Sequence, residues 1–247
     1  SRARRRVRTG FGGVWRDPDH PSQSAIALRG VAVSTRVARG IEFTNRELLD
    51  LGVAWIALGV AFAVFFAGGG MGLVRLLSSG VGSFVLAVVV SLATAGVAFL
   101  LHELGHKVVA TQFGRIAHFR ADYGMLFVAV LSALAGFLFA APGAVYHSGR
   151  GSTEREHGLI AIAGPAVNVV LAVLFVPVFL VGGGGLVELI GGRGVAINLF
   201  LAAFNLVPFG GLDGTTVKRW STAVWIGTFV PSAVLTVVVV FVLGVGF

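Results

Sequence analysis

Two histidines and a glutamate stand close together at the end of a long apolar run, in Leu101-His102-Glu103-Leu104-Gly105-His106. Residues four apart lie on one face of a helix, so His102 and His106 can present both imidazoles to a single Zn²⁺. Glu103, next to the first histidine, can then act as a general base on a water that the ion activates. The spacing therefore predicts a catalytic zinc site.

A catalytic zinc site has three protein ligands and leaves one position for water, so a third ligand is needed. The chain has no cysteine, which restricts that ligand to a histidine or a carboxylate. No glutamate occurs between Glu103 and Glu154, and Asp122, the nearest acid, falls in a predicted polar loop. We favour Asp213, because it follows an apolar helix predicted to end at the same membrane boundary, where a carboxylate needs a partner.

These residues must be positioned by membrane-spanning helices. The 247 residues are 56% hydrophobic and only 12% charged, whereas soluble domains are about 25% charged. Several runs reach the roughly 20 apolar residues that a transmembrane helix needs. We expect an all-α polytopic membrane protein with about five to six transmembrane helices. A membrane-embedded metalloprotease domain over residues 45–247 would have spans at about 45–67, 84–111, 159–181, 195–209 and 222–245.

Glycine-rich stretches separate two pairs of these spans. Gly68-Gly69-Gly70 predicts a turn followed by an outer loop to about Ser83, and residues 182–194 predict a second outer loop.

Positive charge is concentrated ahead of the first span. The net charge is +8, and ten of the nineteen lysines and arginines lie in residues 1–46. A nucleic-acid-binding arm is one interpretation of such a run. A basic segment before a first span instead predicts a cytoplasmic N-terminus. We therefore expect residues 1–44 to form a cytoplasmic tail that meets anionic lipids of the cell membrane and not nucleic acid.

The ligand positions constrain the topology between them. His106 and Asp213 must lie at one membrane boundary, so the chain between them crosses an even number of times. The spans at 159–181 and 195–209 already make two crossings. Residues 124–149 should therefore enter and return as a re-entrant helix and extended segment, with Pro142-Gly143 near the breakpoint. The returning residues 143–148 then form either a strand edge that takes an extended substrate or an ordinary connecting loop.

Three motifs together resemble the site-2 protease family of intramembrane zinc metalloproteases. They are His102-Glu103-x-x-His106, Asn205-x-x-Pro208-(x)4-Asp213-Gly214 and Gly164-Pro165-Ala166-Val167-Asn168. Two positions depart from the family pattern: Gly210 stands where a second proline is usual, and Thr215 replaces a second glycine. We expect a minimal member of the family, without a fused regulatory domain.

The resemblance implies hydrolysis of a peptide bond in or near the transmembrane segment of a single-span, membrane-tethered protein. It implies zinc on His102, His106 and Asp213, with Glu103 as the base and Asn205 contacting the substrate or the oxyanion. The site would open toward the cytoplasm.

Two alternatives remain at this stage. A divalent-metal transporter would spread polar groups through the bilayer and often contains internal repeats, whereas these polar groups cluster at one depth. A non-catalytic relative could lose Glu103, which is present. Asn168, inside an apolar helix, is expected to make an interhelical hydrogen bond that braces the site.

Overall fold

The computed structural model describes residues 41–148 and 151–246, so nearly all of the predicted basic tail lies outside the described residues. Within these described residues, five helical segments are long and apolar enough to cross a membrane. They are α1 (Asn45–Phe66), the continuous segment Val81–Gln112, α6 (Glu154–Val181), α7 (Leu186–Asn205) and the segment Thr222–Val242. The prediction of an all-α polytopic membrane protein is confirmed.

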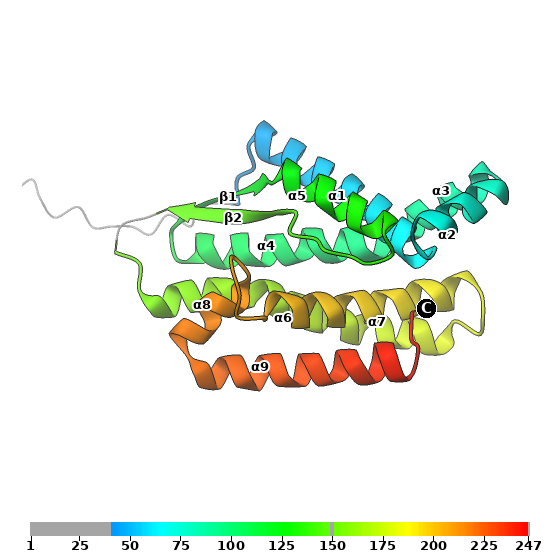
Figure 1. Ribbon diagram of the computed structural model, residues 1–247. Helices are drawn as coiled ribbons and strands as arrows, with labels where there is room; N and C mark the ends of the chain where they lie inside the picture. The colour runs from blue at the N-terminus through cyan, green and yellow to red at the C-terminus, as the bar shows by residue number, and fades with distance from the viewer. Residues whose placement is uncertain (1–40, 149–150, 247) are drawn as a thin grey trace, which may run out of the picture. The chain divides into compact units, whose positions relative to one another are not determined.

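Two of these segments contain a stretch of π-helix. Val81–Gln112 consists of α3 (Val81–Ser91), η2 (Leu92–Gly96) and α4 (Val97–Gln112), and Thr222–Val242 consists of α9 (Thr222–Leu235) and η3 (Thr236–Val242). The shorter elements are α2 (Gly69–Ser78), β1 (Ile116–Ala121), α5 (Tyr123–Leu134), β2 (Gly143–Ser148) and α8 (Asp213–Trp220). The two strands and α8 lie at one end of the bundle, and α2 lies at the other (Figure 1).

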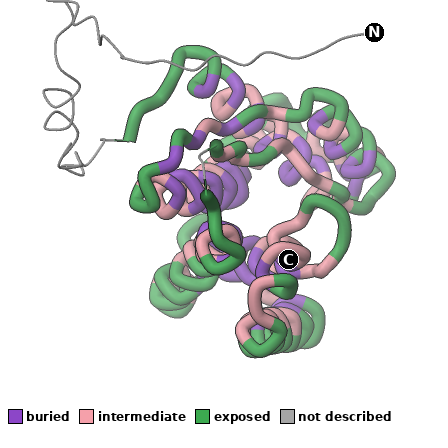
Figure 2. Tube along the Cα trace, turned by 90° about the vertical axis from the view of Figure 1, so that its left-hand side faces the viewer, coloured by how far each residue is buried: buried purple, intermediate pink, exposed green. Residues whose placement is uncertain are grey.

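The outer surface of the bundle is apolar. Large hydrophobic side chains are exposed along α6, among them Val170, Val173 and Leu180. Buried residues instead face the interior of the bundle (Figure 2). Such a surface suits contact with lipid, since lipid chains do not penalise exposed apolar groups.

Residues 124–148, in the predicted re-entrant segment, leave one end of the bundle and return to it. Helix α5 has 12 residues, about 18 Å at 1.5 Å per residue, which is short of the roughly 30 Å hydrocarbon core. Strand β2 then pairs antiparallel with β1, with Gly143 opposite Ala121, so the chain returns to the end from which it left. The tip of the segment touches the start of α2, where a Cβ on Gly69 would lie 3.0 Å from Gly136 Cα.

The predicted span 195–209 and the glycine-rich loop before it are wrong in their bounds. Helix α7 begins at Leu186 and ends at Asn205, and the loop shrinks to residues 182–185. The glycines are helix contacts: a Cβ on Gly191 would lie 2.3 Å from Phe179 N, and one on Gly194 would lie 2.2 Å from the Phe175 ring. Small residues let membrane helices approach closely, so here they indicate packing and not a loop.

The predicted outer loop after the first span is also wrong. Gly68 and Gly69 do make a sharp turn, with φ of +93° and +74°, which glycine adopts without strain. The chain then becomes helical at once, as α2, and the second span begins at Val81 instead of residue 84. The apolar residues of α2 follow a helical spacing, but the glycines before them led to the prediction of a loop.

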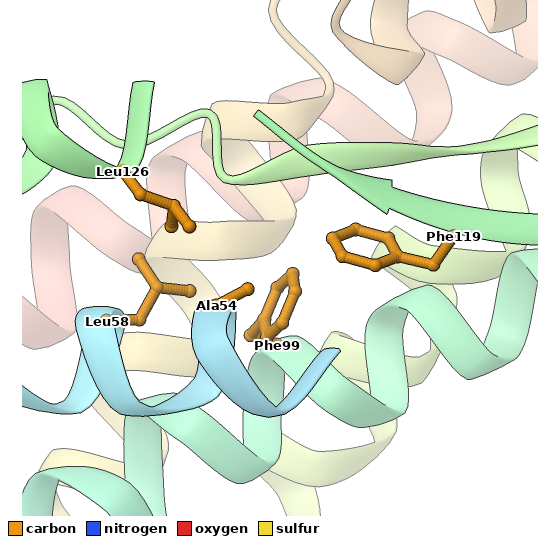
Figure 3. Packing of buried hydrophobic residues seen from close by; sticks show 5 residues of the cluster. All are labelled: Ala54, Leu58, Phe99, Phe119 and Leu126. Carbon is orange, nitrogen blue, oxygen red and sulfur yellow. The ribbon is translucent and has the colours of Figure 1, made fainter. Parts of the chain in front are cut away.

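One buried cluster connects the re-entrant segment to the helix that carries the histidines. Ala54 and Leu58 of α1 meet Phe99 of α4, Phe119 of β1 and Leu126 of α5 (Figure 3). The two phenylalanine rings are 5.6 Å apart in an edge-on arrangement. This cluster fixes the sheet against α4.

A buried ion pair also connects the sheet to α4. Glu47 of α1 and Lys107 of α4 are each 2% exposed, and Lys107 Nζ lies 2.6 Å from the Glu47 carboxylate. Glu47 also accepts a hydrogen bond from the Phe119 amide of β1, at 2.9 Å. One carboxylate therefore joins α1, α4 and β1 directly beside His106.

Candidate metal centre

The glycine of the motif lets α4 approach α6. A Cβ on Gly105 would lie 2.9 Å from Val167 Cγ2 and 3.1 Å from the Ala163 carbonyl oxygen of α6. Only glycine gives this separation without displacing a neighbour. The two histidines, on either side of Gly105 in the sequence, are thereby brought against α6.

Three atoms that could bind a metal ion converge at the end of α4. His102 Nε2 and His106 Nε2 are 3.0 Å apart, and Asp213 Oδ2 lies 3.3 Å from each of them. Ligand atoms bound about 2.0 Å from a tetrahedral zinc ion are about 3.3 Å from one another. The triangle therefore matches one face of a zinc tetrahedron and leaves a fourth corner for water.

The turn between α7 and α8 delivers Asp213 to this triangle. Gly214 packs on the end of α7, where a Cβ would lie 2.0 Å from the Leu206 carbonyl oxygen. Gly210 has a φ of +59°, which proline, restricted to about −65°, cannot adopt. The departure from the family pattern at Gly210 thus accompanies a left-handed turn. At the second departure, the Thr215 amide donates to the Leu212 carbonyl, at 3.1 Å.

The chemistry of the converging atoms fits a cation. His106 Nδ1 faces the Ile160 carbonyl, at 2.8 Å, so Nδ1 carries the proton and Nε2 is an acceptor. Asp213 Oδ2 and Glu103 Oε2 are buried and have no hydrogen-bond partner among the described residues. Acceptors without a donor repel one another in a buried site, and a zinc ion at their centre removes that repulsion.

One face of α6 supports both imidazoles. Ile160, Gly164 and Asn168 are spaced by four residues and so lie in one row along the helix. A Cβ on Gly164 would lie 2.4 Å from His106 Nε2 and 2.6 Å from His102 Nε2. Asn168 Oδ1 lies 2.5 Å from His102 Nδ1, which confirms the predicted interhelical hydrogen bond. Of these contacts, the one with the Ile160 carbonyl could not be predicted from the sequence, because every residue has a backbone carbonyl.

The centre opens into a cavity of about 960 Å³. Its lining includes all five predicted site residues, since Glu103 and Asn205 join the three ligand residues there. Glu103 is 8% exposed. Asn205 Nδ2 donates to the Leu201 carbonyl of its own helix, at 2.9 Å.

Other polar residues are placed differently from the ligands. Asp122 is not part of the centre; it caps α5 by accepting from the Met125 amide, at 3.0 Å. His147 and His157 line the cavity with their ring centres 5.1 Å apart. Burial lowers the pKa of His147, and the neighbouring His157 and Arg115 act in the same direction. The sequence did not point to this pair, because only folding brings β2 beside α6.

No family model matches the chain, and no solved structure matches it. A protein of Methanocaldococcus jannaschii, named "Putative zinc metalloprotease", is 36% identical to it over 185 residues. These residues make up 74% of this chain and 88% of that protein. The chain belongs to this family of zinc metalloproteases. The metalloprotease takes Zn²⁺ as its cofactor, and among the described residues His102, His106 and Asp213 form the group that can hold it.

Proposed function

We propose that this zinc metalloprotease is an intramembrane endopeptidase of the site-2 protease type. The observation that carries the proposal is the position of the ligand triangle. It lies between α8 and two helices of the apolar bundle, α4 and α6, and it opens into a cavity lined by spanning helices and the re-entrant segment. This position supports a substrate whose peptide bond is held in or beside the membrane.

The proposed roles follow from the geometry. His102, His106 and Asp213 would hold the zinc ion, which would supply Lewis acidity for the scissile carbonyl and for a water molecule. Glu103 lines the cavity, and its Oε2 has no hydrogen-bond partner among the described residues. It would take the proton from that water and pass it to the leaving amine. Asn205 has one amide hydrogen on the Leu201 carbonyl, so its second amide hydrogen is available to the developing oxyanion.

The substrate must be extended near the centre, because the carbonyls of a helix are already hydrogen-bonded. Only one edge of the two-stranded sheet can accept it. The Phe119 and Ala121 amides, on the edge of β1 away from β2, donate to Glu47 at 2.9 Å and to Asp50 at 3.3 Å. Two carboxylates of α1 therefore close that edge.

The opposite edge belongs to β2. Hydrogen-bonding groups alternate along an antiparallel strand, so the backbones of Val145 and His147 face away from β1. Both residues line the cavity, and neither amide has a hydrogen-bond partner within the described ranges. We propose that the unwound substrate adds to this edge as a third strand. Specificity would then come from side-chain pockets at alternate positions.

Charge supports a cytoplasmic opening and N-terminus at the cell membrane. In the described residues, seven lysines and arginines belong to segments at the end of the bundle that carries the centre: Arg46, Lys107, Arg115, Arg120, Arg155, Lys218 and Arg219. Two, Arg75 and Arg193, belong to the other half. Positive charge marks the cytoplasmic side of a membrane protein, and the basic tail would contact anionic lipids there.

The test uses purified protein in proteoliposomes with a single-span reporter. The Glu103→Gln variant should retain zinc and lose cleavage by at least about 100-fold, and mass spectrometry of wild-type products should place the cut in the spanning segment. Glu188→Gln, which changes a glutamate at the start of α7, is the matched control and should cleave normally. Full cleavage by the Glu103 variant would refute the assignment of the base.

Metal retention tests the ligand set and separates the rival functions. His102→Ala and Asp213→Ala should lose bound zinc, whereas His118→Ala in β1 should retain it. Uptake of zinc into the vesicles, without cleavage of any reporter, would favour the transporter. A zinc-loaded wild type that neither cleaves nor transports would indicate a non-catalytic relative.

A further inference from the structure

A second asparagine lies behind the first. Asn198 of α7 and Asn168 of α6 are both fully buried. Asn168 Nδ2 donates to Asn198 Oδ1 at 2.9 Å, and Asn198 Nδ2 donates to the Gly194 carbonyl at 2.8 Å. Together with the contact between Asn168 and His102, these bonds form an uninterrupted chain from the backbone of α7 to a predicted zinc ligand.

The backbone fixes the direction of every bond in this chain. A carbonyl oxygen only accepts, so Asn198 must turn its amide nitrogen toward Gly194 and its oxygen toward Asn168. Asn168 must then turn its nitrogen toward Asn198 and its oxygen toward His102. A second carbonyl, that of Ala98, also takes the Asn168 nitrogen, at 3.3 Å. The same orientation is therefore imposed from two helices.

An oxygen facing His102 Nδ1 requires a hydrogen on that nitrogen. The remaining ring nitrogen, Nε2, is then the bare acceptor, and it is the atom that faces His106 and Asp213. We propose that Asn198, acting through Asn168, is a positioning residue that sets the metal-binding tautomer of His102 before zinc arrives. This inference rests on the proposed ligand set but not on the proposed cleavage.

The two histidines differ in what sets their tautomers. His106 Nδ1 faces a backbone carbonyl, that of Ile160, which no substitution removes. His102 depends on side chains alone. A loss of the asparagines should therefore affect one ligand and leave the other unchanged, which is a result that general loosening of the bundle would not give.

Packing between α6 and α7 does not require these asparagines. The glycines Gly191 and Gly194 already bring α7 against Phe179 and Phe175 of α6. Polar residues within a membrane bundle are costly unless they serve a function. Two such residues in series, ending on a metal ligand, fit the role of partners that orient ligands from outside the coordination sphere.

The experiment compares Asn198→Leu with Asn198→Asp in the full chain, purified in detergent. Leucine removes the acceptor that faces Asn168, whereas aspartate keeps an oxygen there in either protonation state. Zinc affinity is measured by competition with a chelator of known affinity. Histidine tautomers in the metal-free protein are read from ¹⁵N chemical shifts of labelled imidazoles, with His102 assigned by comparison with His102→Ala.

We expect Asn198→Leu to weaken zinc binding about 10-fold and Asn168→Leu up to about 100-fold, the range for loss of such supporting contacts. His102 should become a tautomer mixture in Asn168→Leu. The shift should be smaller but detectable in Asn198→Leu, where only the weaker contact from Asn168 to the Ala98 carbonyl, at 3.3 Å, remains. His106 should stay protonated on Nδ1 in both. Asn198→Asp should restore the single tautomer. Thr94→Val is the matched control, because it removes a fully buried hydrogen bond within the same span, to the Val90 carbonyl at 2.8 Å, without touching the histidines.

Wild-type zinc affinity and an unchanged His102 tautomer in Asn198→Leu would overturn the proposal. An equal loss in Thr94→Val would do the same, because it would reduce the effect to general destabilisation. If Asn168→Leu does not fold, the comparison of Asn198→Leu with Asn198→Asp still tests whether Asn198 sets the His102 tautomer. If His102→Ala binds zinc like the wild type, the ligand set fails and the proposal fails with it. A wild type that binds zinc but cleaves nothing leaves the proposal intact.

Discussion

The substitution Gly164→Ala should displace both imidazoles of the proposed zinc site with a single methyl group. The added Cβ would lie 2.4 Å from His106 Nε2 and 2.6 Å from His102 Cε1 and Nε2, whereas ordinary van der Waals contacts lie at about 3.4–4 Å. The rings or α6 must therefore move by about 1 Å. Zinc sites keep their ligand distances within about 0.2 Å, so we expect zinc affinity to fall about 100-fold, at the upper end of the effect of losing a supporting contact.

The same methyl group should cost only about 1–3 kcal/mol in stability, which is typical of overpacking. Zinc affinity is measured by chelator competition, and folding by thermal unfolding of the metal-free protein in detergent. Gly52→Ala is the matched control, because a Cβ there meets nothing within 4 Å. It should bind zinc normally and be slightly stabilised. Unchanged zinc affinity in Gly164→Ala would show that α6 does not press on the ligands as described.

Three further outcomes are expected. Val145→Pro removes an amide that faces the cavity and not β1, so cleavage should fall at least about 10-fold while zinc content stays the same; Tyr146→Pro should instead break the β1–β2 ladder. Lys107→Met leaves the Glu47 carboxylate buried without its partner, and denaturant unfolding should show a loss of about 3–5 kcal/mol. Removal of zinc by a chelator should lower the unfolding temperature, and zinc at 100 times its dissociation constant should restore about 2.7 kcal/mol.

Each of these has an outcome that would count against it. Normal cleavage by Val145→Pro would leave the returning segment as an ordinary connection. The exposed Arg219–Glu154 pair is the control for Lys107, and Arg219→Met should cost less than about 1 kcal/mol. An equal loss in both variants would remove the distinction between buried and exposed ion pairs. An unfolding temperature that does not change when zinc is removed or added would argue against metal binding to the folded state.

The return of residues 124–148 to one end of the bundle was predictable from the sequence, because the proposed ligands require it. His106 and Asp213 can bind one ion only at one depth, so the segment between the predicted spans had to return, and α5 with β2 does so. The helix bounds were less accurate wherever glycine was abundant. Gly191 and Gly194 are compatible with a loop or with tight helix packing. The contacts with Phe179 and Phe175 show that they serve packing, and the sequence alone does not reveal these contacts.

The sequence alone determined the kind of chemistry. Histidines four apart with an adjacent glutamate need only the helical repeat to form two thirds of a zinc site, and Asp213 was the acid compatible with the membrane boundaries. What required the tertiary structure was the support of these ligands. The Ile160 carbonyl, the bare face at Gly164 and the asparagine chain through Asn198 come from helices 50 to 100 residues away, and their contacts depend on how α6 and α7 pack. Local pattern places the ligand residues on a helix, but only packing between helices fixes which ring nitrogen faces the metal.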